Sequence, residues 1–133
     1  MTSSRPILWD DFQPGAELGE FTITFDNAMA QASQAIFGKA SAGGAAEGAS
    51  IALAAMMRAY ATVIAPRPPG NVHARQRFTL EAVPTPGETI RTVVSCAAKE
   101  LKRDRRYVDF HVSATGTGTR PLYSGVLTII WAA

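Results

Sequence analysis

Glu47 is the one carboxylate in a run of Gly and Ala, residues 43–48, that passes directly into the longest helical pattern of the chain. A carboxylate beside a helix start can work as a general base or as a nucleophile, provided that it is buried. It can equally be a charge that the helix dipole and the unpaired amides favour by roughly 0.3–1 kcal/mol. The sequence does not specify burial, so both interpretations stand, and Glu47 is the candidate catalytic residue.

Gly48, Ala49 and Ser50 follow at the helix start, where backbone N–H groups can bind a ligand oxygen and no bulky side chain blocks the approach. The alternative is a Gly-rich turn that allows close packing. Ser50 is not expected to be a nucleophile, because no histidine follows at a suitable spacing and no G-x-S-x-G turn exists. These three residues are therefore candidates for substrate binding only.

Arg75 and Arg77 alternate with His73 and are expected to share one face of a strand. Guanidinium groups pair bidentately with phosphate oxygens, so the two arginines are candidate phosphate ligands. The alternative is a solvated strand face whose arginines pair with Glu81 or Glu88. The sequence leaves both possibilities open.

A second basic cluster surrounds Asp104 at an expected turn, and it consists of Lys102, Arg103, Arg105 and Arg106. Charge at a hairpin tip usually serves solubility, although it can also help to hold an acidic ligand. We expect no metal site, because two isolated histidines and one cysteine supply no ligand cluster.

The whole chain limits the classes of protein to consider. Its 133 residues are expected to form a single domain, 1–133, and its net charge of +2 does not predict a nucleic-acid partner. The N-terminus lacks the apolar segment of a signal peptide, and Arg58 interrupts the Ala-rich run 48–64, which disfavours a membrane span. The single cysteine, Cys96, suits a reducing compartment, so we expect a cytoplasmic protein without membrane contact.

Hydrophobic periodicity predicts the elements that must position these residues. A strand is expected at 20–26, a short helix at 27–37, a loop at 38–47 and a long helix at 49–65, which Pro66 ends. Four further strands are expected in an antiparallel meander, at 72–83, 89–100, 107–114 and 122–131. The prediction is an α+β fold with five antiparallel strands and one long helix.

The long helix is apolar on most sides, because Ser50, Arg58 and Thr62 occupy only about a third of its circumference. A flat sheet would cover one flank, so we expect the sheet to curl around the helix or a second subunit to cover the remainder. The last strand supports this prediction, because it places Leu127 on one face and Val126 on the other.

Three stretches of this sequence resemble MaoC-like acyl-CoA hydratases and dehydratases, and together they span most of the chain. "GNVHARQRFTLEAVPTPGETIRTVVSC" resembles the second and third strands of that family, with its "P-x-x-x-G-E/D-T" turn. "FQPGAELGEFTITF" resembles the start of the first strand, and "AAEGASIALAAMMRAYA" resembles the central helix. The resemblance implies a hotdog fold, in which a curved antiparallel sheet of five strands wraps around one long helix.

The sequence departs from this family at its catalytic motif. Active hydratases of the family have an Asp and a His in a "D-x-N-P-x-H" segment before the central helix, whereas the corresponding stretch here, "FGKASAGGAAEGAS", has neither. The resemblance therefore implies a hydratase/dehydratase-like protein that lacks the usual Asp/His dyad.

The resemblance also implies a ligand and partners. The ligand is an acyl thioester of coenzyme A or of a carrier protein, with the Gly48 and Ala49 amides at the carbonyl and Arg75 and Arg77 at the phosphates. No cofactor is expected beyond the coenzyme A that forms part of the substrate. A side-by-side homodimer is implied, or a pairing with a catalytic hotdog subunit. The alternatives are an acyl-CoA thioesterase that uses Glu47, and a structural dimer without a ligand.

Overall fold

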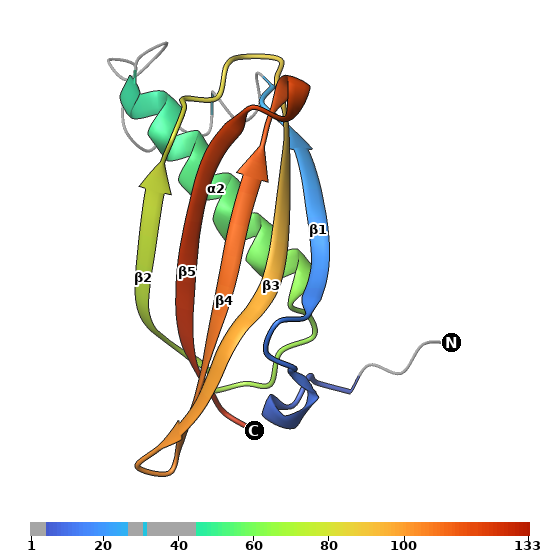
Figure 1. Cartoon of the computed structure of the whole chain (residues 1–133), viewed down its shortest axis with the longest axis vertical. Coiled ribbons are helices and arrows are strands. Elements are labelled where there is room, and N and C mark those ends of the chain that lie inside the picture. The colour runs from blue at the N-terminus through green and yellow to red at the C-terminus, as the bar shows by residue number, and fades with distance from the viewer. Residues whose placement is uncertain (1–4, 27–30, 32–44) are drawn as a thin grey trace.

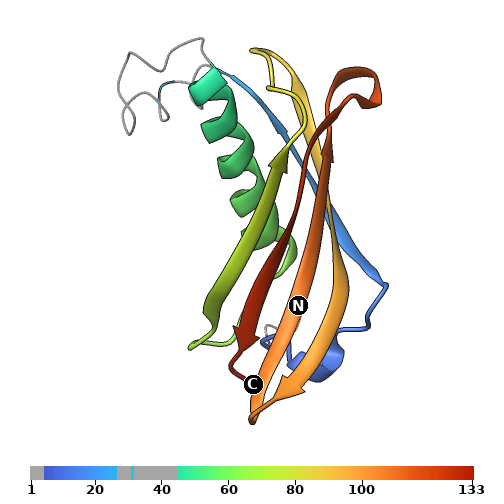
Figure 2. The ribbon, with the colours of Figure 1, turned by 60° about the vertical axis from the view of Figure 1, so that its left-hand side comes forward.

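The structure, a computed structural model, describes residues 5–26, 31 and 45–133. A curved antiparallel sheet of five strands packs one of its faces against a single long helix (Figures 1 and 2). The α+β architecture predicted from the sequence is therefore confirmed. The elements are η1 (Trp9–Asp11), β1 (Glu17–Thr24), α2 (Ala45–Val63), β2 (Val72–Leu80), β3 (Thr89–Lys102), β4 (Arg105–Thr115), η3 (Thr117–Thr119) and β5 (Pro121–Trp131).

The order of strands in the sheet is β1-β3-β4-β5-β2, which differs from the predicted four-strand meander. Only β3, β4 and β5 form a meander, while β2 pairs with β5 at the sheet edge opposite β1. A strand has two hydrogen-bonding edges, and those of β3 are occupied by β1 and β4. Because no edge of β3 remains, β2 pairs with the free edge of β5.

Helix α2 begins four residues earlier and ends two residues earlier than the predicted helix, 49–65. Its buried face includes Ala52, Ala55, Met56 and Ala59, which recur at helical spacing and are almost fully covered. Beyond its end, the Arg67 guanidinium donates to the carbonyls of Ala61 and Ile64, at 2.9 and 2.7 Å. A basic side chain therefore binds the last carbonyls of the helix. In the described part of the chain, no helix is long and apolar enough to cross a membrane.

The side of the helix that points away from the sheet exposes Arg58 and Thr62, as the sequence predicted, and it also exposes Leu53 at 38%. Strand β5 is apolar on both faces, as predicted. Leu127 is fully buried, and Val126 is half-buried on the opposite face. We call the sheet face against α2 the inner face and the opposite one the outer face.

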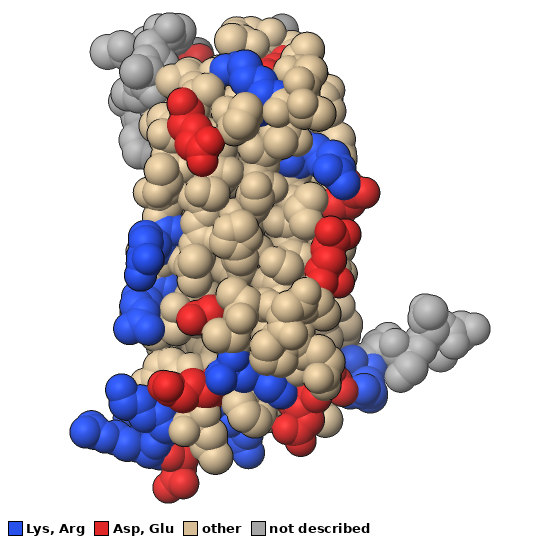
Figure 3. Space-filling model, in the orientation of Figure 1, with Lys and Arg blue, Asp and Glu red and all other residues tan. Residues whose placement is uncertain are grey.

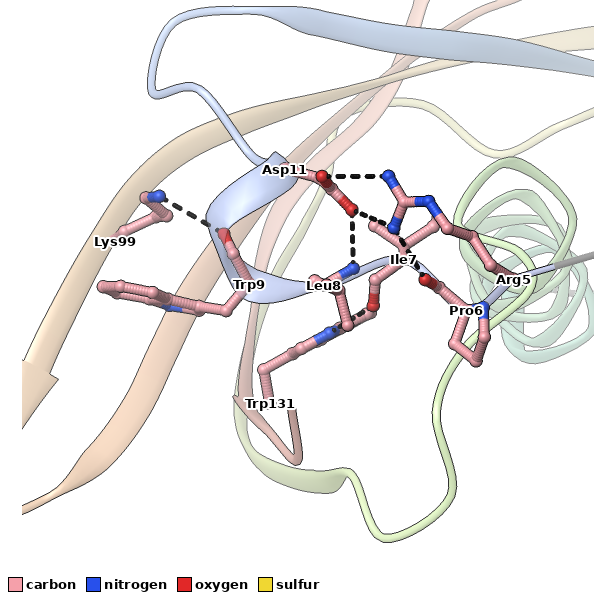
Figure 4. A network of polar contacts seen from close by, with 8 residues as sticks. All are labelled: Arg5, Pro6, Ile7, Leu8, Trp9, Asp11, Lys99 and Trp131. Atoms are coloured by element: carbon pink, nitrogen blue, oxygen red, sulfur yellow. Dashed lines mark hydrogen bonds and ion pairs between the residues drawn. The ribbon is translucent and has the colours of Figure 1, made fainter.

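An aromatic cluster closes one end of the inner face. Phe12, Phe110 and Trp131 pack edge to face, with ring centroids 4.9 to 6.0 Å apart. Figure 4 shows how the N-terminal segment is tied to this end: the Trp131 indole donates to the carbonyl of Ile7 at 2.8 Å, and the Lys99 ammonium donates to the carbonyl of Trp9 at 3.2 Å. The segment thereby covers the end of the core that is farthest from the start of α2.

Gly125 of β5 allows the backbone of β2 to approach closely. The sulfur of Met56 would lie 3.5 Å from a Cβ atom placed on Gly125, and the carbonyl oxygen of Arg77 would lie only 2.4 Å from it. A backbone oxygen in a strand ladder cannot move aside as a flexible side chain can. The absence of a side chain at Gly125 is therefore required by the β2–β5 pairing.

Replacing Gly125 with alanine is expected to lower the free energy of unfolding by about 1–3 kcal/mol, the usual cost of overpacking a core. The added methyl group must displace β2, because the carbonyl oxygen of Arg77 would lie only 2.4 Å from it. Urea unfolding monitored by tryptophan fluorescence measures the change. Ala97→Val, at an exposed position of β3, is the matched control. Equal midpoints for the two variants would contradict the prediction.

Candidate functional site at the start of the long helix

Glu47 lies inside the first turn of α2, because the helix begins at Ala45 and the loop predicted at 38–47 ends earlier than expected. The residue is only 5% exposed. A buried carboxylate is costly, although the amide end of a helix is among the backbone positions that stabilise one best. The burial meets the condition that the catalytic interpretation requires, and the helix position also agrees with the structural interpretation.

Gly48 is buried, and it packs directly against the loop between β2 and β3. A Cβ atom added to Gly48 would lie 1.9 Å from Cγ1 of Val83. This contact shows that the alternative interpretation of Gly48, close packing, applies. Because α2 begins at Ala45, the amides without an intrahelical partner are those up to Glu47. The assignment of the Gly48, Ala49 and Ser50 amides to a ligand stays a prediction.

A buried carboxylate, Glu88, joins the two loops beside the start of α2. Its Oε1 atom accepts from Nη2 of Arg120 at 2.5 Å and from the Thr85 amide at 3.0 Å, and its Oε2 atom accepts from the Thr117 amide at 2.9 Å. Arg120 also donates to the carbonyl of Val83 at 3.3 Å. We call Thr85, Glu88, Thr117 and Arg120 the Glu88 clamp. The clamp fixes the loop residue on which Gly48 packs.

The electrostatics of the clamp follow from its contacts. Burial by itself would raise the pKa of the Glu88 carboxyl, but the amides of Thr85 and Thr117 and the Arg120 guanidinium together lower that pKa below its usual value. Glu88 is thus held as a carboxylate and is a structural element beside the candidate site.

The predicted pairing of Glu88 with Arg75 or Arg77 is wrong, because Glu88 pairs with Arg120. One signal in the sequence pointed to the clamp. Thr85 and Glu88 are three residues apart around Gly87, which has φ +87. This spacing is typical of a tight turn in which the acidic side chain accepts from the backbone.

Arg75 and Arg77 are exposed on the outer face of β2, opposite Thr128 and Val126 of β5. Glu47 belongs to α2, which packs on the inner face, so the structure does not bring the predicted catalytic and phosphate-binding residues together on one face. His73 does not share the face of the arginines. A β-bulge between His73 and Arg75 pairs His73 with the core residue Ile129 and reverses the alternation.

The segment that corresponds to the Asp/His motif of hydratases lies largely outside the described residues, as does the short helix predicted at 27–37. The absence of Asp and His from residues 37–50 is therefore a property of the sequence alone. His111 is exposed on the outer face of β4, and the neighbouring Asp109 accepts from the Thr128 hydroxyl at 2.6 Å. His111 is thus on the face opposite α2.

Comparisons with known proteins identify the architecture. No family model matches the sequence, and no curated protein matches it. Among solved structures, the R-hydratase PhaJ1 from Pseudomonas aeruginosa matches with a TM-score of 0.76 and 16% identity, over 95% of this chain and 86% of that one.

Two further structures match over nearly their whole length. A MaoC-like dehydratase from Rhodospirillum rubrum has a TM-score of 0.73 and 14% identity, over 96% of this chain and 98% of that one. An (R)-hydratase from A. caviae involved in PHA biosynthesis has a TM-score of 0.67 and 15% identity, over 91% and 98%. Identities of this size establish a shared fold. The chain therefore has the hotdog fold, in the form that MaoC-like dehydratases and (R)-hydratases share.

Proposed function

We propose that this chain binds acyl thioesters at the start of α2, as a hydratase/dehydratase-like protein without the standard Asp/His dyad. The observation that supports the proposal is the buried Glu47 carboxylate in the first turn of the central helix, in a fold shared with (R)-hydratases. The amide end of a helix favours an oxygen that gains negative charge, such as a polarised thioester carbonyl. No cofactor is needed other than the coenzyme A of the substrate itself.

The thioester carbonyl is proposed to lie at the helix start beside Gly48, Ala49 and Ser50, where the amides up to Glu47 lack an intrahelical partner, and the coenzyme A phosphates at Arg75 and Arg77. The two groups are on different faces of the sheet. However, β2 is an edge strand, so in a single chain an extended ligand can pass around this edge, and in the homodimer proposed below it must pass the end of the strand instead. The proposal places the protein in the cytoplasm, where such thioesters are used.

A second candidate is a thioesterase in which Glu47 activates a water molecule, and the burial of Glu47 favours it. The Glu88 clamp and the contact between Gly48 and Val83 hold the first turn of α2 in place, as a catalytic base requires. In the first candidate the chain binds a thioester without converting it, for example as the partner of a catalytic hotdog subunit. A structural dimer without a ligand is the remaining alternative.

The proposal includes a side-by-side homodimer. Its support is the open edge of β2, where Val72 is 52% exposed, together with the exposed Leu53 on the outward side of α2. Sedimentation equilibrium is expected to give twice the mass of the chain. A monomer at micromolar concentration would contradict this part of the proposal.

The proposal is tested by calorimetric titration with an acyl-pantetheine thioester, which lacks a nucleotide. Saturable binding to the wild-type chain is expected, together with weaker binding to Gly48→Val, because the new side chain must displace Val83 from the helix start. The isolated chain is expected not to hydrate a trans-2-enoyl thioester. If acyl-pantetheine does not bind, the structural dimer without a ligand is the remaining interpretation. If the isolated chain hydrates the enoyl thioester, the Asp/His dyad is not required for the reaction.

A further inference from the structure

The outer face of the sheet has a hollow of about 260 Å³ that lies away from the start of α2. Figure 3 looks onto this face and shows Lys and Arg side chains gathered at its lower left, over the β3–β4 hairpin and along β2. Four strands contribute to the hollow, which we call the outer-face hollow. Its principal side chains are Arg75, Glu100, Lys102, Tyr107, Asp109 and Thr128.

Two cations of the hollow are available to a ligand. The side chains of Arg75 and Lys102 take part in no ion pair or hydrogen bond within the described part of the chain. Lys99 differs, because its ammonium group lies 4.3 Å from the centre of the Trp9 ring and donates to the Trp9 carbonyl (Figure 4). A guanidinium and an ammonium group without partners at one hollow are typical of a phosphate site.

Two β-bulges shape the hollow. One lies between His73 and Arg75 in β2, and the other lies between Cys96 and Ala98 in β3. The residue that follows each bulge, Arg75 or Ala98, lines the hollow. Bulges redirect side chains and are frequent beside binding sites. The alternation of β2 without its bulge would place Arg75 on the other face, so the bulge is what brings this cation to the hollow.

Tyr107 lies between two groups of cations. Together with Lys102 it also lines an adjoining hollow of about 310 Å³, which Arg103 and Arg105 complete. Its half-buried ring offers an apolar surface beside these charges. A planar base can stack on such a ring while its phosphates reach the surrounding cations.

The hollow also contains negative charge. Glu100 and Asp109 line it, and Asp109 already accepts from the Thr128 hydroxyl at 2.6 Å. These carboxylates repel a chain of phosphates, but they can accept hydrogen bonds from the hydroxyls of a sugar. The mixture of charges therefore favours a ligand that has both phosphate and hydroxyl groups over a simple polyanion.

The hairpin that bears the cations is backbone-strained. Arg103 and Asp104 both have positive φ, 53° and 63°, in a two-residue turn that Asn-Gly would adopt more easily. Residues in such backbone conformations cluster at active sites and ligand-binding segments. This observation is independent of the hollow and points to the same end of the sheet.

We infer that the outer-face hollow binds a nucleoside diphosphate group, with the phosphates at Arg75 and Lys102, the base on Tyr107 and the sugar hydroxyls toward Glu100 and Asp109. The group can belong to coenzyme A or to a free nucleotide. In the first case the inference extends the proposed function, with which it shares Arg75. In the second it describes a separate site.

Calorimetric titration with ADP tests the inference. ADP is expected to bind saturably, and Arg75→Gln and Lys102→Gln are each expected to weaken it about tenfold, since each removes a charge-assisted hydrogen bond. Tyr107→Leu is expected to weaken ADP binding but not the binding of pyrophosphate. Arg58→Gln is the matched control, because it removes an exposed cation from α2, and it is expected to leave the affinity unchanged. Thermal unfolding checks that each variant is folded.

Three results would overturn the inference: no ADP binding, pyrophosphate binding as tight as ADP binding, or an equal loss in Arg58→Gln. Coenzyme A distinguishes the two sources of the group. If it binds more tightly than ADP, the group belongs to coenzyme A, and if the two bind equally, it belongs to a free nucleotide. Acyl-pantetheine lacks the nucleotide, so its binding tests only the proposed site at the start of α2. ADP binding tests only the outer-face hollow, and each proposal can therefore fail independently of the other.

Discussion

Replacing Glu88 with alanine is expected to lower the free energy of unfolding by about 1–3 kcal/mol, because a buried carboxylate that accepts from two amides and from a partly exposed guanidinium is removed. The variant leaves the amides of Thr85 and Thr117 and one face of the Arg120 guanidinium without their acceptor. Urea unfolding of the purified variant measures the loss.

The matched control is Glu20→Ala, which removes a carboxylate from the exposed ion pair between Glu20 and Arg91. Exposed pairs contribute about 0–1 kcal/mol, so the control is expected to unfold close to the wild type. Equal losses in the two variants would show that the Glu88 clamp does not differ from a surface pair. The comparison therefore isolates the effect of burial.

The contribution of Glu88 depends on pH in a defined direction. Its pKa is lower in the folded chain than in the unfolded chain, so its stabilising effect is complete above the usual carboxyl pKa and is lost as the pH falls through the lowered value. The difference between wild type and Glu88→Gln is therefore expected to be constant at neutral pH and to shrink in acid. A difference that grows in acid would contradict the sign of this pKa shift.

The periodicity of the sequence was enough to predict the strands but not the place of β2. Alternation of apolar and polar residues predicts which face of a strand is buried. The prediction is correct for β4, in which Val108, Phe110 and Val112 are buried. It contains no information on which strand lies beside which. That choice depends on which edges are free, and for β2 the free edge belongs to β5, distant in the sequence.

The sequence was enough to identify residues of the candidate site, but not to predict which residues they contact. The start of α2 was located to within four residues from the helical pattern, which identified Glu47. Gly48 packs against Val83, which a loop from elsewhere in the chain brings to the helix. The β-bulge at Arg75 was likewise invisible, because a single extra residue in a strand leaves the composition and the period almost unchanged.

In the thioesterase candidate, replacing Glu47 with glutamine is expected to lower kcat for thioester cleavage by about 100- to 10,000-fold, because the amide cannot accept the proton of the attacking water. The side chain keeps its size, so KM for the thioester is expected to change little. Steady-state hydrolysis, followed by the release of free thiol, measures both constants. Glu81→Gln is the matched control, because Glu81 is an exposed glutamate of the loop that packs on α2.

The stability of Glu47→Gln separates the catalytic from the structural interpretation. A carboxylate that serves only the helix dipole contributes roughly 0.3–1 kcal/mol to stability, and its loss would be seen in unfolding without any change in turnover. A catalytic base gives the opposite result, with a large loss of turnover and a small change in stability. The Glu88 clamp positions the loop against Gly48, so Glu88→Gln is expected to reduce stability first and turnover only as the helix start loosens. A loss of turnover in Glu88→Gln as large as that in Glu47→Gln, with the fold intact, would transfer the essential role from Glu47 to the clamp.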